Sequence, residues 1–386
     1  MKSSERVAAG AASGPPERPR RVSLILHKFS RGGSDRVAAY LARGFADQGI
    51  DVDLVVFAKG GEVEAILSQI VGDGIPIRYL GKAAGWRGLD LILGLPKLVS
   101  LLRAEAPDAV ISTANNTSWV TAVAVKLAGL RRTRLILKTT NPIAFSRHRG
   151  LLRRVRLWGY RLTFRRTQAV WTLSAQESEE MRTQFPDQAG LFHDVANPYV
   201  TSAMFTPPLI PAPAAPGKTI ICIARLTAQK RLDRLIAAFA RVRTPQARLL
   251  ILGEGEDRET LNGLVADLGL QDRVSMPGFV ANVAPELHRA DLFVLTSDYE
   301  GLPAAVLEAM AANCPVLGTD CFPAARAILS DAEGCAVIEQ TDPDNLARLI
   351  DEHLAGPKPT RLRQVAERYS IANGVSSHLA ALSRCY

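Results

Sequence analysis

The chain has 386 residues and a formal net charge of +9, with 47% hydrophobic and 22% charged residues. This globular composition excludes wholesale disorder and fibrous repeats, and the length suits two domains of roughly 150 to 200 residues each. No apolar run approaches the roughly 18 to 20 residues that a membrane-spanning helix needs. Segment 1–20 lacks the apolar stretch of a secretion signal, so we expect it to be a disordered tail.

From residue 21 onward, short apolar and β-branched runs alternate with stretches of helical character. Strands that alternate with helices predict crossover connections and a parallel sheet buried on both faces. We therefore expect an α/β N-terminal domain over residues 21–206. Its strands are predicted at residues 21–26, 53–57, 109–112, 134–137 and 169–173.

Segment 207–217 contains five prolines in eleven residues, which predicts an extended linker between domains. The alternation then restarts and predicts a second α/β domain over residues 218–370. Residues 371–386 are expected to form a C-terminal helix, for which the N-terminal domain is a candidate packing surface. Because parallel strands end at one edge of a sheet, we expect a ligand cleft between the carboxyl ends of the two sheets. The strands of the second domain are predicted at residues 219–224, 247–252, 274–276, 292–295 and 315–318.

Two loops that join a strand to a helix have the residues expected for phosphate binding. Gly32 and Gly33 follow the first strand, where glycine lets the backbone approach a ligand and free N–H groups favour anions. A tight turn without a ligand explains these glycines equally well. Arg225, Lys230 and Arg231 follow the first strand of the second domain, and they supply a planar fork and compact charges for a diphosphate. A solvated helix start is the alternative, but three basic residues favour phosphate.

Two carboxylates accompany the strand predicted at 292–295. Glu300 lies in the turn after this strand, Pro303 can begin a helix, and Glu308 falls in the second turn of that helix. Carboxylates accept hydrogen bonds from hydroxyl groups, so the pair suits a sugar and a ribose. The alternative is a turn residue and a paired buried one. Because Glu308 lies in an otherwise apolar stretch and needs a partner, we favour the binding role.

Several of these motifs occur together and in order, and they resemble retaining glycosyltransferases of family 4 over roughly residues 219–340. The resemblance implies the GT-B fold, in which two Rossmann-like parallel-sheet domains face each other across a cleft. It is looser in the first domain, at residues 32–37 and 197–198. The motifs are Arg225-Leu226, residues 229–232, 250–255, 300–303 and 308–310, and Cys314-Pro315-Val316.

The resemblance also implies a substrate and roles for individual residues. A nucleotide diphosphate-sugar would bind mainly to the second domain and an acceptor to the first, with no metal or other cofactor. Arg225 and Lys230 would bind the diphosphate and stabilise charge on the leaving nucleotide, which is the main demand of glycosyl transfer. Glu300 would contact the hydroxyl groups of the donor sugar. The implied binding residues also include Glu308 at the ribose, the backbone of Gly301 and Leu302 at the sugar and phosphates, and Gly33 near the diphosphate.

One departure from the family pattern concerns the acceptor side. Many relatives carry a histidine after the strand equivalent to 134–138, whereas this chain reads Lys138-Thr139-Thr140-Asn141-Pro142, with His148 nearby. A histidine role on the acceptor side is therefore not supported. A nucleotide-sugar isomerase or epimerase on a similar scaffold, and a non-catalytic nucleotide-binding membrane adaptor, remain alternatives to sugar transfer.

The positive charge is concentrated in the first half of the chain. The first 200 residues carry 29 Lys and Arg against 17 Asp and Glu, and the rest carry 18 against 21. Eight arginines and no acidic residue lie between Arg147 and Arg166, interleaved with Leu, Trp, Tyr and Phe. This pattern is typical of a helix that lies on an anionic membrane, so we expect a lipid-linked, polysaccharide or lipopolysaccharide-type acceptor. A helix with a core face and solvated arginines is the alternative. No nucleic-acid motif accompanies the charge.

The cysteines and acidic pairs give no sign of a metal or disulfide framework. Five cysteines are widely spaced without a C-x-x-C pair, which favours a reducing cytoplasm. The pairs Asp51/Asp53 and Asp342/Asp344 are better explained as element boundaries than as metal ligands. We therefore expect a cytoplasmic protein that is peripherally associated with the inner face of the membrane.

Overall fold

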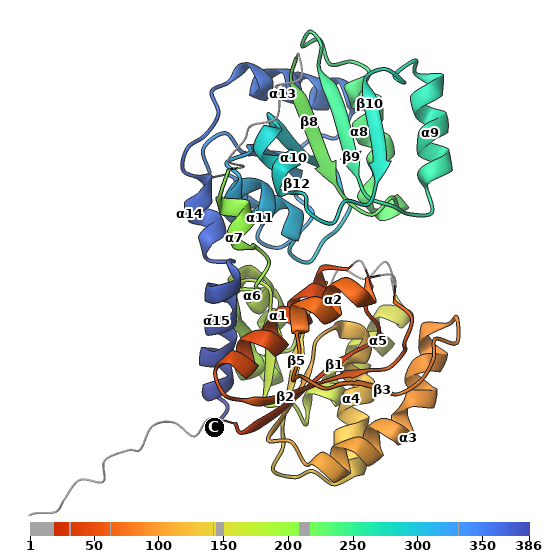
Figure 1. Ribbon diagram of the computed structural model, residues 1–386, viewed down its shortest axis with the longest axis vertical. Coiled ribbons are helices and arrows are strands. Elements are labelled where there is room, and N and C mark those ends of the chain that lie inside the picture. The colour runs from red at the N-terminus through yellow and green to blue at the C-terminus, as the bar shows by residue number, and fades with distance from the viewer. Residues whose placement is uncertain are drawn as a thin grey trace, which may run out of the picture.

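The computed structural model describes residues 19–30, 32–61, 63–141, 143, 150–207, 217–330 and 332–386. Within these residues the chain forms two α/β domains, each built on a parallel sheet, which lie one above the other in Figure 1. The predicted fold class is thereby confirmed. Nearly all of the expected tail, most of the proline-rich linker, and Arg147 and Arg149 of the basic stretch lie outside the described residues.

Seven parallel strands form the first sheet, in the order β3-β2-β1-β4-β5-β6-β7. The sheet grows outward from β1, where Val22 pairs with Val52 on one side and with Ala109 on the other. The central strands are buried on both faces because helices cover both faces of the sheet. The strands are β1 (Arg21–Leu26), β2 (Asp51–Val56), β3 (Ile77–Tyr79), β4 (Ala109–Ser112), β5 (Arg134–Lys138), β6 (Ala169–Thr172) and β7 (Phe192–Asp194).

The helices of the first domain divide between the two faces of its sheet. One core contains apolar residues of α1 and α2, and the other contains those of α3, α4, α5 and α6. This division follows from right-handed crossovers, because the chain moves to one side of β1 and then to the other. The helices are α1 (Gly33–Asp47), α2 (Glu64–Val71), α3 (Arg87–Glu105), α4 (Asn115–Ala128), α5 (Leu151–Phe164) and α6 (Ala175–Gln184), with η1 (Pro186–Leu191) and α7 (Ser202–Phe205) after them.

The second domain repeats this architecture with six parallel strands, in the order β10-β9-β8-β11-β12-β13. Its strands are β8 (Thr219–Ile223), β9 (Arg248–Leu252), β10 (Val274–Gly278), β11 (Leu292–Leu295), β12 (Val316–Thr319) and β13 (Ala336–Ile338). Its helices are η2 (Ala228–Lys230), α8 (Leu232–Phe239), α9 (Arg258–Asp267), α10 (Ala284–Arg289), α11 (Ala304–Ala311), α12 (Ala325–Leu329), α13 (Pro343–Ala355) and α14 (Leu362–Glu367).

Three strands have no counterpart in the sequence prediction, namely β3, β7 and β13. Each has three residues and lies at an edge of its sheet. An edge strand has one neighbour and is partly exposed, so it needs neither the length nor the continuous apolar run that reveals a central strand.

After the second domain the chain returns to the first. Helix α15 (Ile371–Ser383) packs against α1, and Figure 1 shows it in blue along the side of the first domain. The returning segment is hydrogen-bonded to the outgoing one, because the N–H of Val200 donates to Tyr369 O at 3.0 Å and that of Ile371 to Val200 O at 3.1 Å. The chain therefore crosses between the domains twice, and the two crossings lie side by side.

A glycine lets α15 approach the first domain closely. A Cβ on Gly374 would lie 2.4 Å from Pro198 N, a distance that side chains do not adopt. We predict that Gly374→Ala lowers the free energy of unfolding of the first domain by about 1–3 kcal/mol, because backbone has to move. Urea denaturation followed by circular dichroism measures this change.

Gly263→Ala in α9 is the matched control, because nothing lies within 4 Å of the added methyl group. The same substitution should there raise stability by about 0.5–1 kcal/mol through helix propensity. Equal effects at the two positions would contradict the close approach of α15.

Candidate active site

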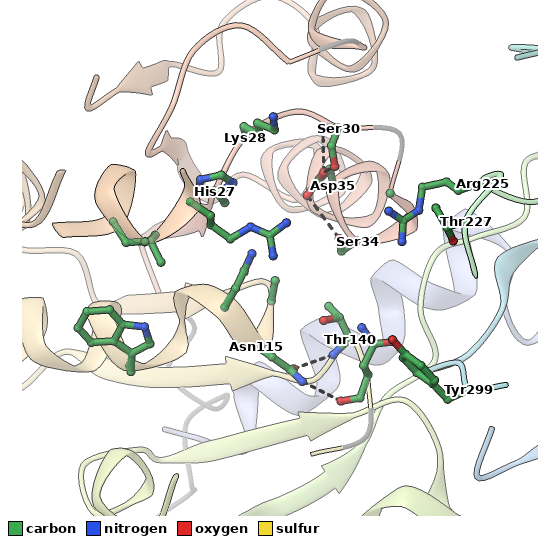
Figure 2. Close-up of a pocket in the computed structure, with 18 of the residues that line it drawn as sticks. His27, Lys28, Ser30, Ser34, Asp35, Asn115, Thr140, Arg225, Thr227 and Tyr299 are labelled. Carbon is green, nitrogen blue, oxygen red and sulfur yellow. Dashed lines mark hydrogen bonds between the residues drawn. The ribbon is translucent and has the colours of Figure 1, made fainter. Parts of the chain in front are cut away.

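Two cavities lie in the cleft between the domains, one of about 1120 Å³ and one of about 400 Å³. Residues of both domains line each of them, and Arg225 lines both. Figure 2 shows the wider cavity, with His27 and Lys28 on the first-domain side and Arg225 and Thr227 on the other. The cavities are therefore two compartments of one interdomain cleft.

All seven residues predicted from the sequence line the smaller cavity. Gly33 begins α1, and Arg225 and Lys230 follow β8. The other four come from the turn after β11 and from α11. They meet because strands that are parallel deliver their following loops to one edge of the sheet. The seven residues are Gly33, Arg225, Lys230, Glu300, Gly301, Leu302 and Glu308.

Lys230 and Glu300, which both line the smaller cavity, form an ion pair. Ser297 Oγ also donates to Glu300 Oε1 at 2.7 Å, and the Glu300 N–H donates to Cys321 O at 2.6 Å. Gln229 Nε2 donates to Tyr299 O at 2.7 Å and so ties η2 to this turn. The carboxylate and the ammonium group are thereby held in contact before any ligand binds.

Gly301 brings the two domains into backbone contact. A Cβ at this position would lie 2.1 Å from Thr140 O and 2.7 Å from Leu173 Cδ1, and both of these residues belong to the first domain. Only glycine therefore fits here. The turn that carries Glu300 is pressed directly against the loop after β5.

Glu308 pairs across the cleft with a residue that the sequence analysis did not identify. Arg36 Nη2 of α1 lies 2.5 Å from Glu308 Oε1 of α11, and the Glu308 side chain is buried. The charge of Glu308 raises the pKa of the Arg36 guanidinium. Arg36 was missed because its partner is 272 positions away in the chain, and a lone arginine in a helix gives no local signal.

A buried lysine lies on the wall of the smaller cavity where the family pattern has its histidine segment. Lys138 Nζ donates to Asn197 Oδ1 at 2.5 Å and lies 2.8 Å from His378 Nε2. His378 comes from α15, and its other ring nitrogen lies 2.7 Å from Gly374 O. Burial lowers the pKa of Lys138 to about 7 and keeps His378 neutral by lowering its pKa. His148 lies outside the described residues.

The described residues offer no obvious metal site, since they contain no group of three or more His, Cys, Asp or Glu side chains that could hold an ion. Lys230 and Arg225 supply positive charge at the smaller cavity. Lys230 and Arg225 face the same space as Glu300 and Glu308, so a ligand with both phosphates and hydroxyl groups matches the arrangement.

Two parallel-sheet domains with their ligand cleft between the carboxyl ends define a GT-B protein. Solved structures with this fold superpose on nearly the whole chain. The lipopolysaccharide outer core galactosyltransferase WaaB has a TM-score of 0.70 at 17% identity, over 95% of this chain and 100% of its own. Anabaena HepE, in complex with UDP and glucose, has a TM-score of 0.71 at 18% identity, over 95% and 97%.

The model of the group 1 glycosyl transferases matches residues 211–370, and the glycosyl transferase 4-like domain matches residues 32–191. The chain belongs to this family of glycosyltransferases, group 1 or family 4. A Bacillus subtilis poly(glycerol-phosphate) alpha-glucosyltransferase is 29% identical over 223 residues, which are 56% of this chain and 32% of that protein. The chain thus matches about a third of the length of this relative.

The Arg36–Glu308 pair yields a prediction about interdomain coupling. Arg36→Met leaves the Glu308 carboxylate buried without its partner, so we expect a loss of about 1–3 kcal/mol in the free energy of unfolding. The double variant Arg36→Met/Glu308→Met should lose less than the sum of the single variants. Urea denaturation of the four proteins gives a coupling energy, expected at about 0.5–3 kcal/mol. Additive losses would show that the two charges do not interact.

Proposed function

We propose that this protein transfers a sugar, with retention and without a metal, from a nucleotide diphosphate-sugar to a lipid-linked, polysaccharide or lipopolysaccharide-type acceptor. The observation that carries the proposal is the smaller cavity, in which Arg225 and Lys230 face Glu300 and Glu308. A nucleotide sugar contains a matching sequence of groups, with hydroxyls on both sides of a diphosphate. The complex of HepE with UDP and glucose supports this donor class, and WaaB supports the acceptor class.

The leaving group makes the main chemical demand. When the bond from the sugar to the phosphate breaks, negative charge grows on the diphosphate, and positive groups fixed in place lower the barrier. Lys230 is held by Glu300, and Arg225 lies at the junction of the two cavities. The eight-residue helix α11 begins at Ala304 beside Gly301 and Leu302, so its N-terminal dipole also favours the phosphates.

The carboxylates position the two sugars of the donor. Glu300 accepts hydrogen bonds from hydroxyl groups of the transferred sugar. Because Glu300 contacts Lys230, this sugar lies next to the diphosphate. Glu308 accepts hydrogen bonds from the ribose hydroxyl groups. A carboxylate has room for several hydrogen bonds, so Glu308 binds the ribose while it keeps Arg36 of the opposite domain. Donor binding then links the two domains.

We predict that one nucleoside diphosphate in a panel of UDP, GDP, ADP, CMP and NAD raises the melting temperature, and that Lys230→Ala abolishes the shift. A ligand at 100 times its dissociation constant stabilises the native state by about 2.7 kcal/mol. Lys230→Ala should also lower kcat by about 10²–10³-fold, measured as acceptor-dependent release of the nucleoside diphosphate.

Arg248→Ala is the control, because this exposed residue begins β9 at the opposite end of the strand from the cleft. It should keep both the shift and the activity. A response to NAD alone, or to none of the ligands, would overturn the proposed donor site. Nucleotide release without an acceptor would favour an isomerase.

Helix α5 supports peripheral binding to an anionic membrane. Four apolar residues at positions i, i+4, i+7 and i+11 form one exposed stripe, and the opposite side contributes Phe164 to the core. In this stripe Leu151 is 75% exposed and Trp158 is 62% exposed. Arginines flank the stripe, so the helix presents apolar and basic groups together away from the core. The exposed stripe is Leu151, Val155, Trp158 and Leu162.

Two neighbouring helices extend the apolar surface. α4 exposes Trp119, Val123 and Leu127 at successive turns, and α3 exposes Ile92 and Leu93. Both helices lie on the same face of the sheet as α5. None of the helices in the described ranges is long and apolar enough to cross a bilayer. We therefore propose that the protein lies on the inner face of the membrane through α3, α4 and α5.

We predict that the protein binds vesicles containing phosphatidylglycerol and that Arg154→Gln/Arg165→Gln weakens the binding by about 30-fold. Each basic residue near an anionic surface contributes about 1 kcal/mol, and about 1.4 kcal/mol corresponds to tenfold. Vesicle sedimentation at low and high salt measures the effect. Arg131→Gln/Arg132→Gln removes the same charge from the loop after α4 and should have little effect. Equal losses in both variants would show that the charge acts without a defined docking face.

A further inference from the structure

The first-domain wall of the wider cavity has a strongly positive character that the donor does not require. Two helices of this domain begin at the wall, namely α3 at Arg87 and α4 at Asn115, and they contain 19 and 14 residues. The N–H groups of a first helical turn lack partners within the helix, and the helix dipole adds partial positive charge there. Two such ends at one cavity favour an anion.

Three cationic side chains lie on the same wall, Lys28, Arg87 and Arg156. Lys28 follows β1, Arg87 begins α3, and Arg156 lies in α5. Within the described part of the chain, no carboxylate pairs with any of the three. The Nε atom of Arg156 is buried without a hydrogen-bond partner, while its guanidinium lies 5.7 Å from the centre of the Tyr160 ring.

The acidic groups near this wall already have partners. Asp90 Oδ2 lies 3.0 Å from His27 Nε2, and its other oxygen accepts the Ala84 N–H at 2.7 Å. Asp35 accepts the N–H and the hydroxyl group of Ser30, as Figure 2 shows. Burial raises the pKa of Asp35, while its hydrogen bonds with Ser30 lower it. Neither acid is in an ion pair with Lys28, Arg87 or Arg156.

Two of the cations, Lys28 and Arg87, lie near His27. Lys28 is next to His27 in the chain, and Arg87 begins the helix that carries the Asp90 partner of His27. Burial lowers the pKa of His27, Asp90 raises it, and the charges of Arg87 and Lys28 lower it, so both cations act on the same imidazole. Neither Lys28 nor Arg87 forms an ion pair with a carboxylate of the described residues, so both ends remain available to an anion in the cavity.

The cationic wall of the wider cavity and the proposed donor site lie in different cavities. Lys230, Glu300 and Glu308 line the smaller cavity only, whereas Lys28, Arg87 and Arg156 line the wider one only. The two cavities meet at Arg225. An acceptor in the wider cavity thus brings its reacting hydroxyl to this junction, and its anionic group lies farther into the first domain.

An apolar surface adjoins the cationic wall. Trp119 lines the wider cavity and is 45% exposed, and Trp86, next to Arg87, is 67% exposed. From Trp119 the exposed stripe of α4 continues over Val123 and Leu127. A ligand whose phosphate contacts Arg87 has apolar surface available directly beyond it. The junction at Arg225, the cationic wall and the apolar surface thus follow one another in the same order as the sugar, the phosphate and the lipid chain of a lipid-linked sugar.

We propose that Lys28, Arg87 and Arg156 form an acceptor subsite for the phosphate or diphosphate that joins the acceptor sugar to an apolar chain. The inference rests on the proposed function, because it makes the wider cavity the acceptor side of the same cleft. It adds the chemical class of the acceptor and the residues that recognise it. Charge-assisted hydrogen bonds from arginine and lysine suit a phosphate ester.

Isothermal titration calorimetry of the full chain with farnesyl diphosphate tests the subsite. We expect saturable binding that Arg87→Gln/Arg156→Gln weakens by about 10–100-fold, since two charge-assisted hydrogen bonds are lost. Arg131→Gln/Arg132→Gln, which removes equal charge elsewhere in the domain, should bind like the wild type. Lys230→Ala should also keep the affinity, which shows that the probe does not occupy the donor diphosphate site.

Two further ligands separate the sources of the anion. Inorganic diphosphate should bind at least tenfold more weakly than farnesyl diphosphate, and farnesol should bind without sensitivity to the arginine substitutions. Equal binding of inorganic diphosphate would overturn the lipid-linked acceptor, and unchanged affinity in Arg87→Gln/Arg156→Gln would overturn the subsite. Loss of farnesyl diphosphate binding in Lys230→Ala would also overturn it. The nucleotide panel reports separately on the donor site, so a failure of either proposal is recognised by itself.

Discussion

A parallel sheet delivers the carboxyl ends of all its strands to one edge, and in this protein two such edges face each other. Each loop that follows a strand therefore opens toward the same cleft, although the loops are far apart in the sequence. Glycines make the approach possible, because Gly301 places the turn after β11 against Thr140 of the other domain. The chemical character of the cleft follows from which residues stand at these strand ends.

The charged residues of the cleft form two groups, one in which cations and carboxylates are paired and one in which the cations have no carboxylate partner among the described residues. In the smaller cavity each carboxylate holds a cation, Glu300 with Lys230 and Glu308 with Arg36, so a ligand rearranges pairs that already exist. On the first-domain wall of the wider cavity, Arg87 and its neighbours face solvent without such partners among the described residues. An ion pair with no net charge adapts to a polar ligand, whereas cations without an ion-pair partner favour an anionic one.

Much of the fold and of the smaller cavity could be predicted from the sequence, because strand–helix alternation and the motifs around Lys230, Glu300 and Glu308 are local patterns. The central strands have long apolar runs, while β3 and β13 are three-residue edges without one. Arg36, Arg87 and His378 were missed for a different reason. The partners of Arg36 and His378 are 272 and 240 positions away, and Arg87 shares its cavity wall with Lys28 and Arg156, so only the folded chain brings these residues together.

The paired crossings between the domains have a mechanical consequence. A single connecting segment would let one domain swivel freely about it, but two crossings tied by hydrogen bonds between Val200, Tyr369 and Ile371 resist twisting. The movement that these two segments still allow is a hinge motion of one domain relative to the other. In such a motion, residues next to the connecting segments move least and residues on the opposite side of the cleft move most.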